Sequence, residues 1–214
     1  EHAANLFGLK EFGNIYSRLG NPTVGALEAR LTDLEDGAMC VALSSGTSAV
    51  MYSLINIMSQ GDNFVTANQL YGGTYTMFDN ILPEYGIDSK KVDITDFKAV
   101  EEAIDDKTRA IYCETITNPG LVVADVTALS EIAHSKGIPL IVDATFTTPA
   151  IQKSFDFGAD IVVYSLTKWM SGHGRVIAGA VIEKGGFDWG NGNFPLYDKP
   201  DTSYGGMRWG HDLG

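Results

Sequence analysis

Residues 159–174 read ADIVVYSLTKWMSGHG, in which a short apolar run leads directly into a hydroxyl-rich turn that contains Lys168. The run is too short for a core helix and is rich in β-branched residues, so it predicts a buried strand. Similar runs occur upstream and alternate with stretches of helical periodicity; they are MCVAL, FVTA, RAIYCE and PLIVD. This alternation predicts an α/β fold with a mostly parallel sheet that helices cover on both faces.

Residues with strong capping preferences mark the predicted helices. Asn21 is expected to cap a helix that begins at Pro22, and Asp125 is expected to cap another, because both side chains can accept the free N–H groups of a first turn. Thr95 is expected to cap a helix that runs to Ile104. Further helices are predicted up to about Ser59 and over 71–82, and RVIAGAVIE (175–183) predicts a strand that returns antiparallel or at an edge.

The chain divides by composition into three parts. Residues 1–36 predict an N-terminal arm, irregular over 1–20, and the first helix, while residues 37–185 contain the α/β alternation of a large domain. Residues 186–214 are rich in Gly, Pro and aromatic residues without a clear period, which predicts a long irregular loop. Because such a loop is unusual at the end of a compact unit, we expect it to lead toward a C-terminal domain that these residues do not contain.

Composition limits the classes of partner. With 214 residues, 44% of them hydrophobic and 20% charged, the chain can bury a sizeable core. Its formal net charge of −12 disfavours a nucleic acid or an anionic membrane as partner. The sequence contains no apolar run of the roughly 18 residues that a membrane-spanning helix requires.

Cysteine and histidine usage points away from disulfide and metal chemistry. Cys40 and Cys113 lie in strand-like segments without CxxC spacing, so we expect buried, reduced thiols and a cytoplasmic location. The four histidines show no ligand spacing, and no metal site is predicted. Among them, His173 follows the turn at Lys168 and either lines a site there or has a structural role.

Chemistry-bearing residues follow five of the predicted strands. In an open parallel sheet, ligands bind at the carboxyl ends of the strands, so these residues are expected to converge. They are Ser45, Gly46 and Thr47 after MCVAL, Tyr71 after FVTA, Asn118 after RAIYCE, Asp143 after PLIV, and Ser165, Thr167 and Lys168 after DIVVY. Taken singly, each kind has an ordinary alternative: a glycine turn, a packing tyrosine, a capping aspartate or a solvated lysine.

Together these groups match the needs of one kind of cofactor. A pyridine-based aldehyde needs a lysine to form an imine and an acid that keeps its ring nitrogen protonated. It also needs a surface on which the ring stacks and a phosphate anchor, which the N–H groups at a helix N-terminus can provide. Lys168, Asp143, Tyr71 and the turn at Gly46 supply these four kinds of group.

Five motifs in a fixed order extend this agreement to a known family. The motifs YSRLGNPT, SSGTSA, ETITNP, VDATFTTP and ADIVVYSLTKWMSGHG resemble those of the Cys/Met-metabolism enzymes that depend on pyridoxal 5′-phosphate (PLP). The resemblance covers the chain from about residue 12 onward. It implies the large domain of the PLP-dependent transferase type I fold, which is the aspartate-aminotransferase fold.

The resemblance implies a role for each matching position. Lys168 would carry the cofactor as a Schiff base and move protons, Asp143 would pair with the ring nitrogen, and Tyr71 would stack on the ring. These three are the expected catalytic residues. Asn118 would contact the ring hydroxyl. The other expected cofactor contacts within the chain, chiefly to the phosphate, come from Ser45, Gly46, Thr47, Ser165 and Thr167.

The resemblance also implies a homo-oligomer, a dimer of dimers. Tyr16 and Arg18 would contact the cofactor phosphate of a neighbouring subunit. The alternative for Arg18 is an ordinary surface-loop arginine.

Two segments narrow the expected reaction. FGNIYSR (12–18) and FDWGNGNFPLYDKPDTSYGG (187–206) resemble O-acetylhomoserine sulfhydrylases, which implies a transferase that makes L-homocysteine and acetate from O-acetyl-L-homoserine and sulfide, in methionine and cysteine biosynthesis. The alternatives are a cystathionine γ-synthase or γ-lyase of the same family, or a non-catalytic PLP-binding fragment. Two features depart from the family: Ala144 stands where asparagine is frequent, and the arginine for the substrate carboxylate has no counterpart.

Overall fold

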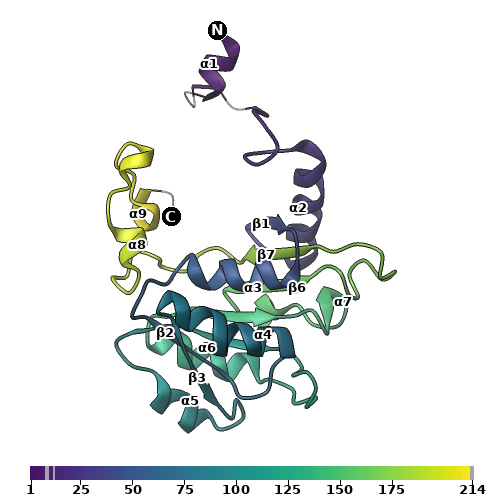
Figure 1. The fold of residues 1–214 in the computed structure, drawn as a ribbon, viewed down its shortest axis with the longest axis vertical. Helices are drawn as coiled ribbons and strands as arrows, with labels where there is room; N and C mark the ends of the chain where they lie inside the picture. Colours follow the sequence, from purple (N-terminus) through teal and green to yellow (C-terminus); the bar gives the residue numbers. More distant parts are fainter. Residues whose placement is uncertain (8–9, 12, 213–214) are drawn as a thin grey trace.

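The computed structural model, which describes residues 1–7, 10–11 and 13–212, is built around a seven-stranded sheet (Figure 1). Its strands are β1 Met39–Leu43, β2 Asn63–Ala67, β3 Asp88–Val92, β4 Thr108–Glu114, β5 Leu140–Asp143, β6 Ile161–Ser165 and β7 Gly179–Glu183. The order across the sheet is β1-β7-β6-β5-β4-β2-β3. All pairs from β6 to β3 are parallel, and β7 pairs antiparallel with both of its neighbours. The predicted mostly parallel α/β fold is confirmed.

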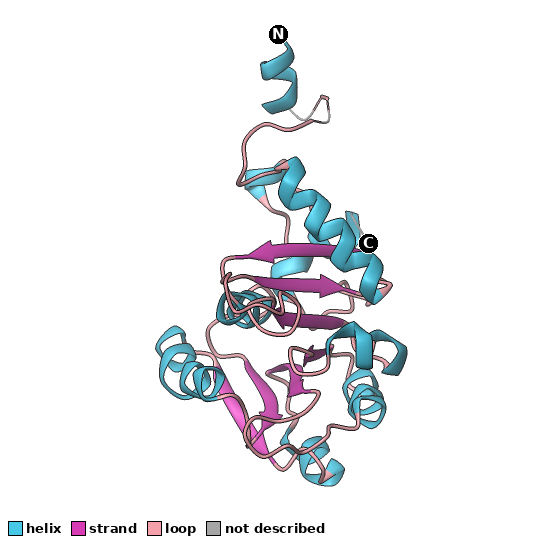
Figure 2. Ribbon diagram, turned by 90° about the vertical axis from the view of Figure 1, so that its right-hand side faces the viewer, coloured by secondary structure: helices cyan, strands magenta, loops and turns pink. Residues whose placement is uncertain are grey.

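Helices lie on both sides of the strands (Figure 2). They are α1 His2–Phe7, α2 Pro22–Glu35, α3 Gly46–Ile55, α4 Gly72–Thr76, α5 Phe97–Ala103, α6 Val126–Ser135, α7 Thr148–Ile151, α8 Pro195–Asp198 and α9 Trp209–Asp212. Because both faces are covered, every residue of β2 and of β4 is buried. This explains why apolar residues occupy successive positions in the middle of these strands, instead of alternating with polar ones.

The helix starts follow from the capping residues, with one correction. The Asn21 side chain accepts from the N–H of Thr23 at 2.9 Å, and Asp125 caps α6 as predicted. The prediction that Thr95 caps the next helix is wrong, since Asp96 caps α5. Thr95 is already bound to Asp93, which accepts both its N–H and its hydroxyl.

Three other element boundaries differ from the predictions. The helix predicted over 71–82 is α4 followed by a π-helical turn, Met77–Ile81, and a 3-10 turn, Leu82–Tyr85, where Pro83 has no N–H to continue an α-helix. The helix predicted to reach Ser59 ends at Ile55. The strand predicted over 175–183 is antiparallel as expected, but it lies inside the sheet and is limited to β7.

Both ends of the chain contain more structure than predicted. In residues 1–20, expected to be irregular, α1 forms and stands apart from the body of the domain (Figure 1). Residues 186–212 include α8, α9 and a cluster of aromatic rings against the core. The cluster contains Phe187, Trp189, Phe194 and Tyr197, with ring centroids 4.6–5.8 Å apart. The division of the chain into three parts stays a prediction.

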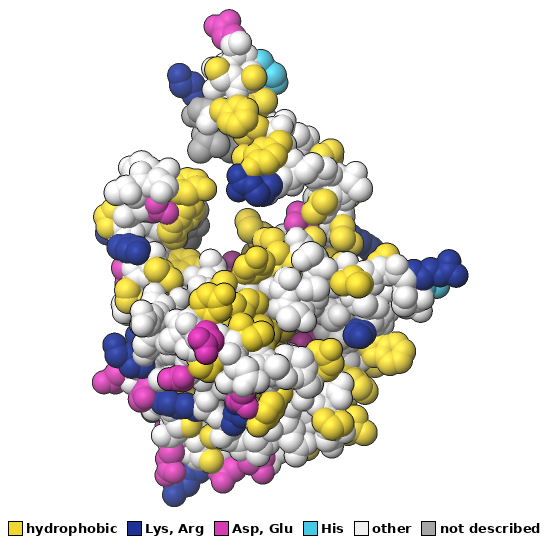
Figure 3. All heavy atoms as spheres, viewed as in Figure 1, with side chains coloured by type: hydrophobic (Ala, Val, Ile, Leu, Met, Phe, Trp, Pro, Cys, Tyr) yellow, Lys and Arg dark blue, Asp and Glu magenta, His cyan; other side chains and the backbone are white. Residues whose placement is uncertain are grey.

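The surface combines charged and apolar regions. Figure 3 shows acidic and basic side chains intermixed over the lower part of one face, and hydrophobic side chains gathered near the hollow between the C-terminal helices and the N-terminal arm. Cys40 and Cys113 are both buried, as predicted. Within residues 1–7, 10–11 and 13–212, no helix combines the length and apolarity needed to cross a membrane.

Candidate functional site

A cleft of about 810 Å³ opens where five strands end. β1 and β6 both pair antiparallel with β7, so they run in the same direction. Their carboxyl ends therefore lie on the same side of the sheet. Nine of the predicted site residues line the cleft: Ser45, Gly46, Thr47, Tyr71, Asn118, Asp143, Ser165, Thr167 and Lys168. The convergence expected from the strand ends is therefore present in the structure.

Tyr16 and Arg18 lie outside this cleft. They belong to the N-terminal arm, where the guanidinium carbon of Arg18 is 5.1 Å from the centre of the Tyr16 ring. Tyr16 is 46% exposed. Their contact with the phosphate of a neighbouring subunit stays a prediction.

The N-terminus of α3 packs tightly against the end of β6. A Cβ atom added to Gly46 would lie 2.5 Å from the Cβ of Ser165, so a larger residue would push these segments apart. Gly179 allows a similar approach, because its Cβ would lie 2.0 Å from the carbonyl oxygen of Ser45. This packing places the first-turn N–H groups of a ten-residue helix beside Ser165, which suits an anion such as a phosphate group.

Lys168 lies in a turn that backbone hydrogen bonds hold in place. Its N–H donates to the Ser165 carbonyl at 3.1 Å, and its own carbonyl accepts from Gly172 at 3.0 Å. The hydroxyl of the preceding Thr167 accepts from the N–H of Ala178 at 3.1 Å, which fixes the turn against the approach to β7. The Lys168 side chain is exposed to the cleft, and among the described residues its amine has no carboxylate partner.

Asp143 is the last residue of β5, and both of its carboxylate oxygens are hydrogen-bonded. One accepts from the N–H of Thr145 at 2.9 Å and the other from the Tyr112 hydroxyl at 3.3 Å. Burial raises the pKa of Asp143, and the bonds from Thr145 and Tyr112 oppose this shift. A cation in the cleft would favour the ionised form of the carboxyl group.

Glu114 is a residue of the cleft that sequence reasoning did not select. It ends β4, lines the cleft and is 5% exposed. Burial raises its pKa to about 7, and the nearby Asp143 adds to this shift, while the N–H groups of Tyr71 and Asn118 oppose it. The sequence signal that could have identified Glu114 is an acidic residue placed directly at the end of a predicted buried strand.

The cleft also has apolar walls that were not predicted. Phe146, Trp169 and Ile177 contribute large side chains, of which Trp169 and Ile177 are 66% and 76% exposed. His173, one of the sequence candidates, is exposed with its Nδ1 2.6 Å from the Ser171 carbonyl oxygen, between two glycines that do line the cleft. Periodicity could not identify these walls, because they lie on loops.

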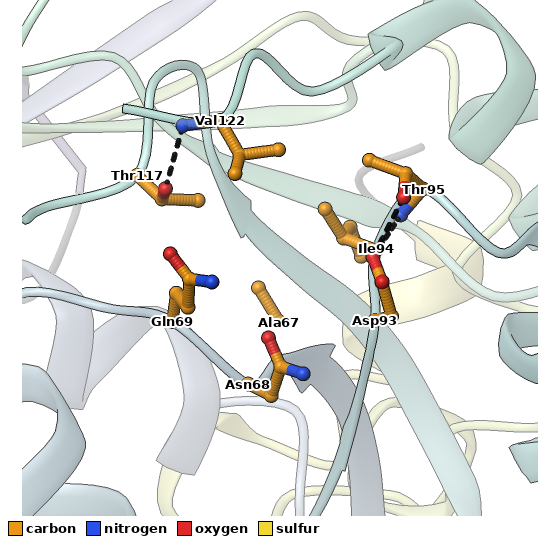
Figure 4. Close-up of a pocket in the computed structure, with 8 residues that line it drawn as sticks. All are labelled: Ala67, Asn68, Gln69, Asp93, Ile94, Thr95, Thr117 and Val122. Atoms are coloured by element: carbon orange, nitrogen blue, oxygen red, sulfur yellow. Dashed lines mark hydrogen bonds between the residues drawn. The ribbon is translucent and has the colours of Figure 1, made fainter. Parts of the chain in front are cut away.

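A smaller hollow of about 100 Å³ adjoins the same loops (Figure 4). Figure 4 shows the side chain of Gln69 near Thr117, which in turn accepts from the N–H of Val122. Tyr71 and Asn118, which follow Gln69 and Thr117 closely in the chain, line the larger cleft. The two loops that carry these residues therefore border both spaces.

Clusters of possible metal ligands were sought in the part of the chain that the structure describes. It contains no group of three or more His, Cys, Asp or Glu side chains placed to hold a metal ion.

Several known proteins resemble this chain, among them sulfhydrylases. The O-acetyl-L-homoserine sulfhydrylase of Leptospira meyeri is 47% identical over 208 residues, which cover 97% of this chain and 47% of the relative. A crystal structure described as an O-acetylhomoserine (thiol)-lyase from Campylobacter jejuni matches with a TM-score of 0.93 and 39% identity, over 97% of this chain and 52% of that one. That structure contains an N′-pyridoxyl-lysine-5′-monophosphate.

A cystathionine γ-lyase from Lactobacillus plantarum also matches, with a TM-score of 0.76 and 41% identity over 79% of this chain and 44% of that one. The chain spans about half the length of the curated relatives it matches. A family model described as Cys/Met metabolism PLP-dependent enzyme matches residues 1–200. The chain therefore belongs to the Cys/Met metabolism family of PLP-dependent enzymes.

Proposed function

We propose that this chain supplies the cofactor-binding half of an enzyme that converts O-acetyl-L-homoserine and sulfide to L-homocysteine and acetate. In this γ-replacement, a carbon–sulfur bond at Cγ takes the place of the carbon–oxygen bond through which acetate leaves. The observation that carries the proposal is the convergence of Lys168, Asp143 and the α3 N-terminus on one cleft. The substrate is inferred from the relatives, several of which are named O-acetyl-L-homoserine sulfhydrylase.

The donor set of the cleft fits PLP. The close approach of Gly46 to Ser165 leaves a cradle of N–H groups and hydroxyls for a phosphate, to which Ser45, Thr47 and Thr167 would contribute. Asp143 would accept a hydrogen bond from the protonated ring nitrogen, and the positive charge of the ring would offset the burial that raises the pKa of this carboxyl group. The remaining ring contacts would come from the Tyr71 ring and the Asn118 amide.

Bound PLP supplies an electron sink for negative charge that develops beside the substrate amine. Lys168 would hold the cofactor covalently and then, as a free amine, move the proton at the substrate Cα. The hydrogen bonds of Lys168 to Ser165 and Gly172 fix its backbone, and only the side chain would have to move between these two tasks. Tyr71, which lines the cleft, would stack on the ring, and its hydroxyl would assist proton movement.

The proposed assembly is a homo-oligomer in which the N-terminal arm serves a neighbouring subunit. The exposed Tyr16 and the adjacent Arg18 would contact the neighbour's cofactor phosphate.

The proposed location is the cytoplasm. Cys40 and Cys113 are buried as free thiols, which agrees with a reducing, cytoplasmic setting.

The lysine assignment is tested by chemical trapping in the full-length protein. After incubation with PLP and reduction with borohydride, peptide mapping should find the pyridoxyl group on the peptide that contains Lys168. Lys168→Ala should lose turnover almost completely, while Lys98→Ala, at a side chain 84% exposed on α5, should behave as wild type. A pyridoxyl group on another lysine, or retained turnover in Lys168→Ala, would refute the assignment.

The nucleophile separates the proposed reaction from its alternatives. Homocysteine formed from sulfide supports the sulfhydrylase. A product that forms only with cysteine would indicate a cystathionine γ-synthase. A product that forms without any added nucleophile would indicate a γ-lyase, and one structural neighbour is described as a cystathionine γ-lyase. PLP capture without any turnover would favour a non-catalytic PLP-binding protein.

A further inference from the structure

Glu114 is a buried carboxyl group of the cleft that has no role in the proposed reaction. It ends β4, a strand whose seven residues are all buried, and only 5% of it is exposed. Burying a carboxylate is costly unless it is hydrogen-bonded. The partners of Glu114 therefore indicate which contacts keep it there.

Each oxygen of the Glu114 carboxylate accepts one backbone hydrogen bond from a residue of the cleft. Oε1 accepts from the N–H of Tyr71 at 2.7 Å, and Oε2 accepts from the N–H of Asn118 at 2.9 Å. Tyr71 follows β2, whereas Asn118 follows β4, so the two loops come from different strands. Bonds from N–H donors to an ionised acceptor are stronger than neutral ones. One carboxylate thus joins two loops whose side chains face the cleft.

These loops have little room to move independently. A Cβ atom added to Gly120 would lie 1.5 Å from Oε1 of Gln69, so the two loops are in close contact beside the small hollow (Figure 4). The loop after β4 is also closed internally, because Val122 donates to the Thr117 hydroxyl at 3.0 Å. A displacement of one loop would therefore be passed to the other.

The backbone position of Tyr71 also determines where its ring lies. A Cβ atom added to Gly73 would lie 2.6 Å from Cε1 of the ring, so the ring rests on the first turn of α4. The Tyr71 carbonyl accepts from the N–H of Tyr75 at 2.8 Å. Glu114 fixes the N–H of the same residue, which leaves the ring few alternative positions.

We propose that Glu114 is a positioning residue of the cofactor site, which acts through the two backbone N–H groups to hold the Tyr71 ring and the Asn118 amide in place. This inference rests on the proposed function, because both side chains are taken to contact PLP. A buried acid with only a structural role would support folding alone. A positioning role requires that its loss change the binding and the environment of PLP.

The test compares Glu114→Gln with wild type in the full-length protein. Glutamine keeps the size of the side chain but offers one acceptor oxygen, so one N–H would face an amide donor. We expect the Kd for PLP, measured by absorbance titration, to rise about tenfold, in line with the loss of one hydrogen bond to a charged group. The visible circular dichroism of bound PLP should also change, because the ring orientation changes.

The matched control is Asp160→Asn, just before the amino-terminal end of β6 and outside the cleft at the carboxyl ends of the strands. Asp160 is also a buried carboxylate, 7% exposed, that accepts a backbone N–H, from Leu140 at 2.8 Å. This variant should lose stability while the Kd for PLP stays at the wild-type value. In a Tyr71→Ala/Asn118→Ala background, Glu114→Gln should change the Kd for PLP by less than about twofold, because the side chains that it positions are gone.

The outcomes separate this inference from the proposed function. Wild-type protein that binds no PLP would refute the proposed function. If wild type binds PLP and Glu114→Gln shows the same Kd and circular dichroism, or if its full effect persists in the Tyr71→Ala/Asn118→Ala background, positioning by Glu114 is refuted. Should Glu114→Gln not fold, amide hydrogen exchange in wild type decides: the N–H groups of Tyr71 and Asn118 should be protected, and exchange within seconds would overturn the proposal.

Discussion

Glu114 and Asp143 lie directly opposite each other, as the last residues of the adjacent parallel strands β4 and β5. Paired residues of neighbouring strands project to the same face, so both carboxyl groups reach the cleft. Burial raises the pKa of each, to about 7 for Glu114, where the charge of Asp143 contributes to the shift. The two acids differ in their contacts: Glu114 binds two loops, whereas Asp143 binds Thr145 and Tyr112.

Glu114 should make the protein less stable as pH rises from about 4.5 to 7. Its pKa in the unfolded chain is near 4.5, so between these values the folded state holds more protons than the unfolded state. The contribution of Glu114 to the free energy of unfolding is therefore largest below pH 4.5 and is lost as pH rises through 7, by roughly 3 kcal/mol at most. Urea unfolding from pH 4.5 to 8 should show a smaller decrease in Glu114→Gln than in wild type, and parallel profiles would contradict the expectation.

Gly46→Ala should damage the proposed phosphate site and destabilise the fold. The added Cβ would lie 2.5 Å from the Ser165 side chain, and such overpacking typically costs ~1–3 kcal/mol. The Kd for inorganic phosphate or PLP should rise as α3 moves away from β6. Gly25→Ala is the control, because its Cβ meets nothing within 4 Å near the N-terminal end of α2. It should stabilise the protein by about 0.5–1 kcal/mol in thermal unfolding. Unchanged binding in Gly46→Ala would argue against a phosphate cradle.

The N-terminal arm can be tested by subunit complementation. If Arg18 serves the neighbouring subunit, Arg18→Ala and Lys168→Ala should each be nearly inactive, while coexpression should restore about a quarter of the wild-type activity through mixed dimers. A mixture of Lys168→Ala with Asp143→Ala is the control, because both residues line the cleft of one subunit. It should restore no activity. Absence of recovery in the first mixture would place Arg18 outside the neighbour's site.

The aromatic cluster after β7 should be part of the stable core. Phe194 is fully buried and contacts the rings of Phe187 and Trp189, so Phe194→Ala should lower the free energy of unfolding by about 3–5 kcal/mol. Tyr204→Ala, at a ring 53% exposed in the same segment, should cost less than about 1 kcal/mol. Similar stability losses in the two variants, measured by urea unfolding, would contradict this role.

Local chemistry made much of the fold predictable. Asn21 and Asp125 begin their helices because a short polar side chain meets the free N–H groups of the first turn. Short β-branched runs marked every strand of the interior, whereas β3, with the sequence DSKKV at the edge of the sheet, has no apolar pattern and was not predicted. Thr95 failed as a cap because Asp93 competes for its side chain and N–H.

By itself, the sequence determined which residues end the strands, and with them Lys168, Asp143 and the turn at Gly46. Only the tertiary structure decided that Glu114 binds the loops of Tyr71 and Asn118, because these bonds join segments 43 and 4 residues away through backbone groups that carry no sequence signal. The same holds for Phe194, whose burial depends on packing against a distant core rather than on any local period. Strand ends follow from local periodicity, whereas contacts between loops depend on how the whole sheet brings them together.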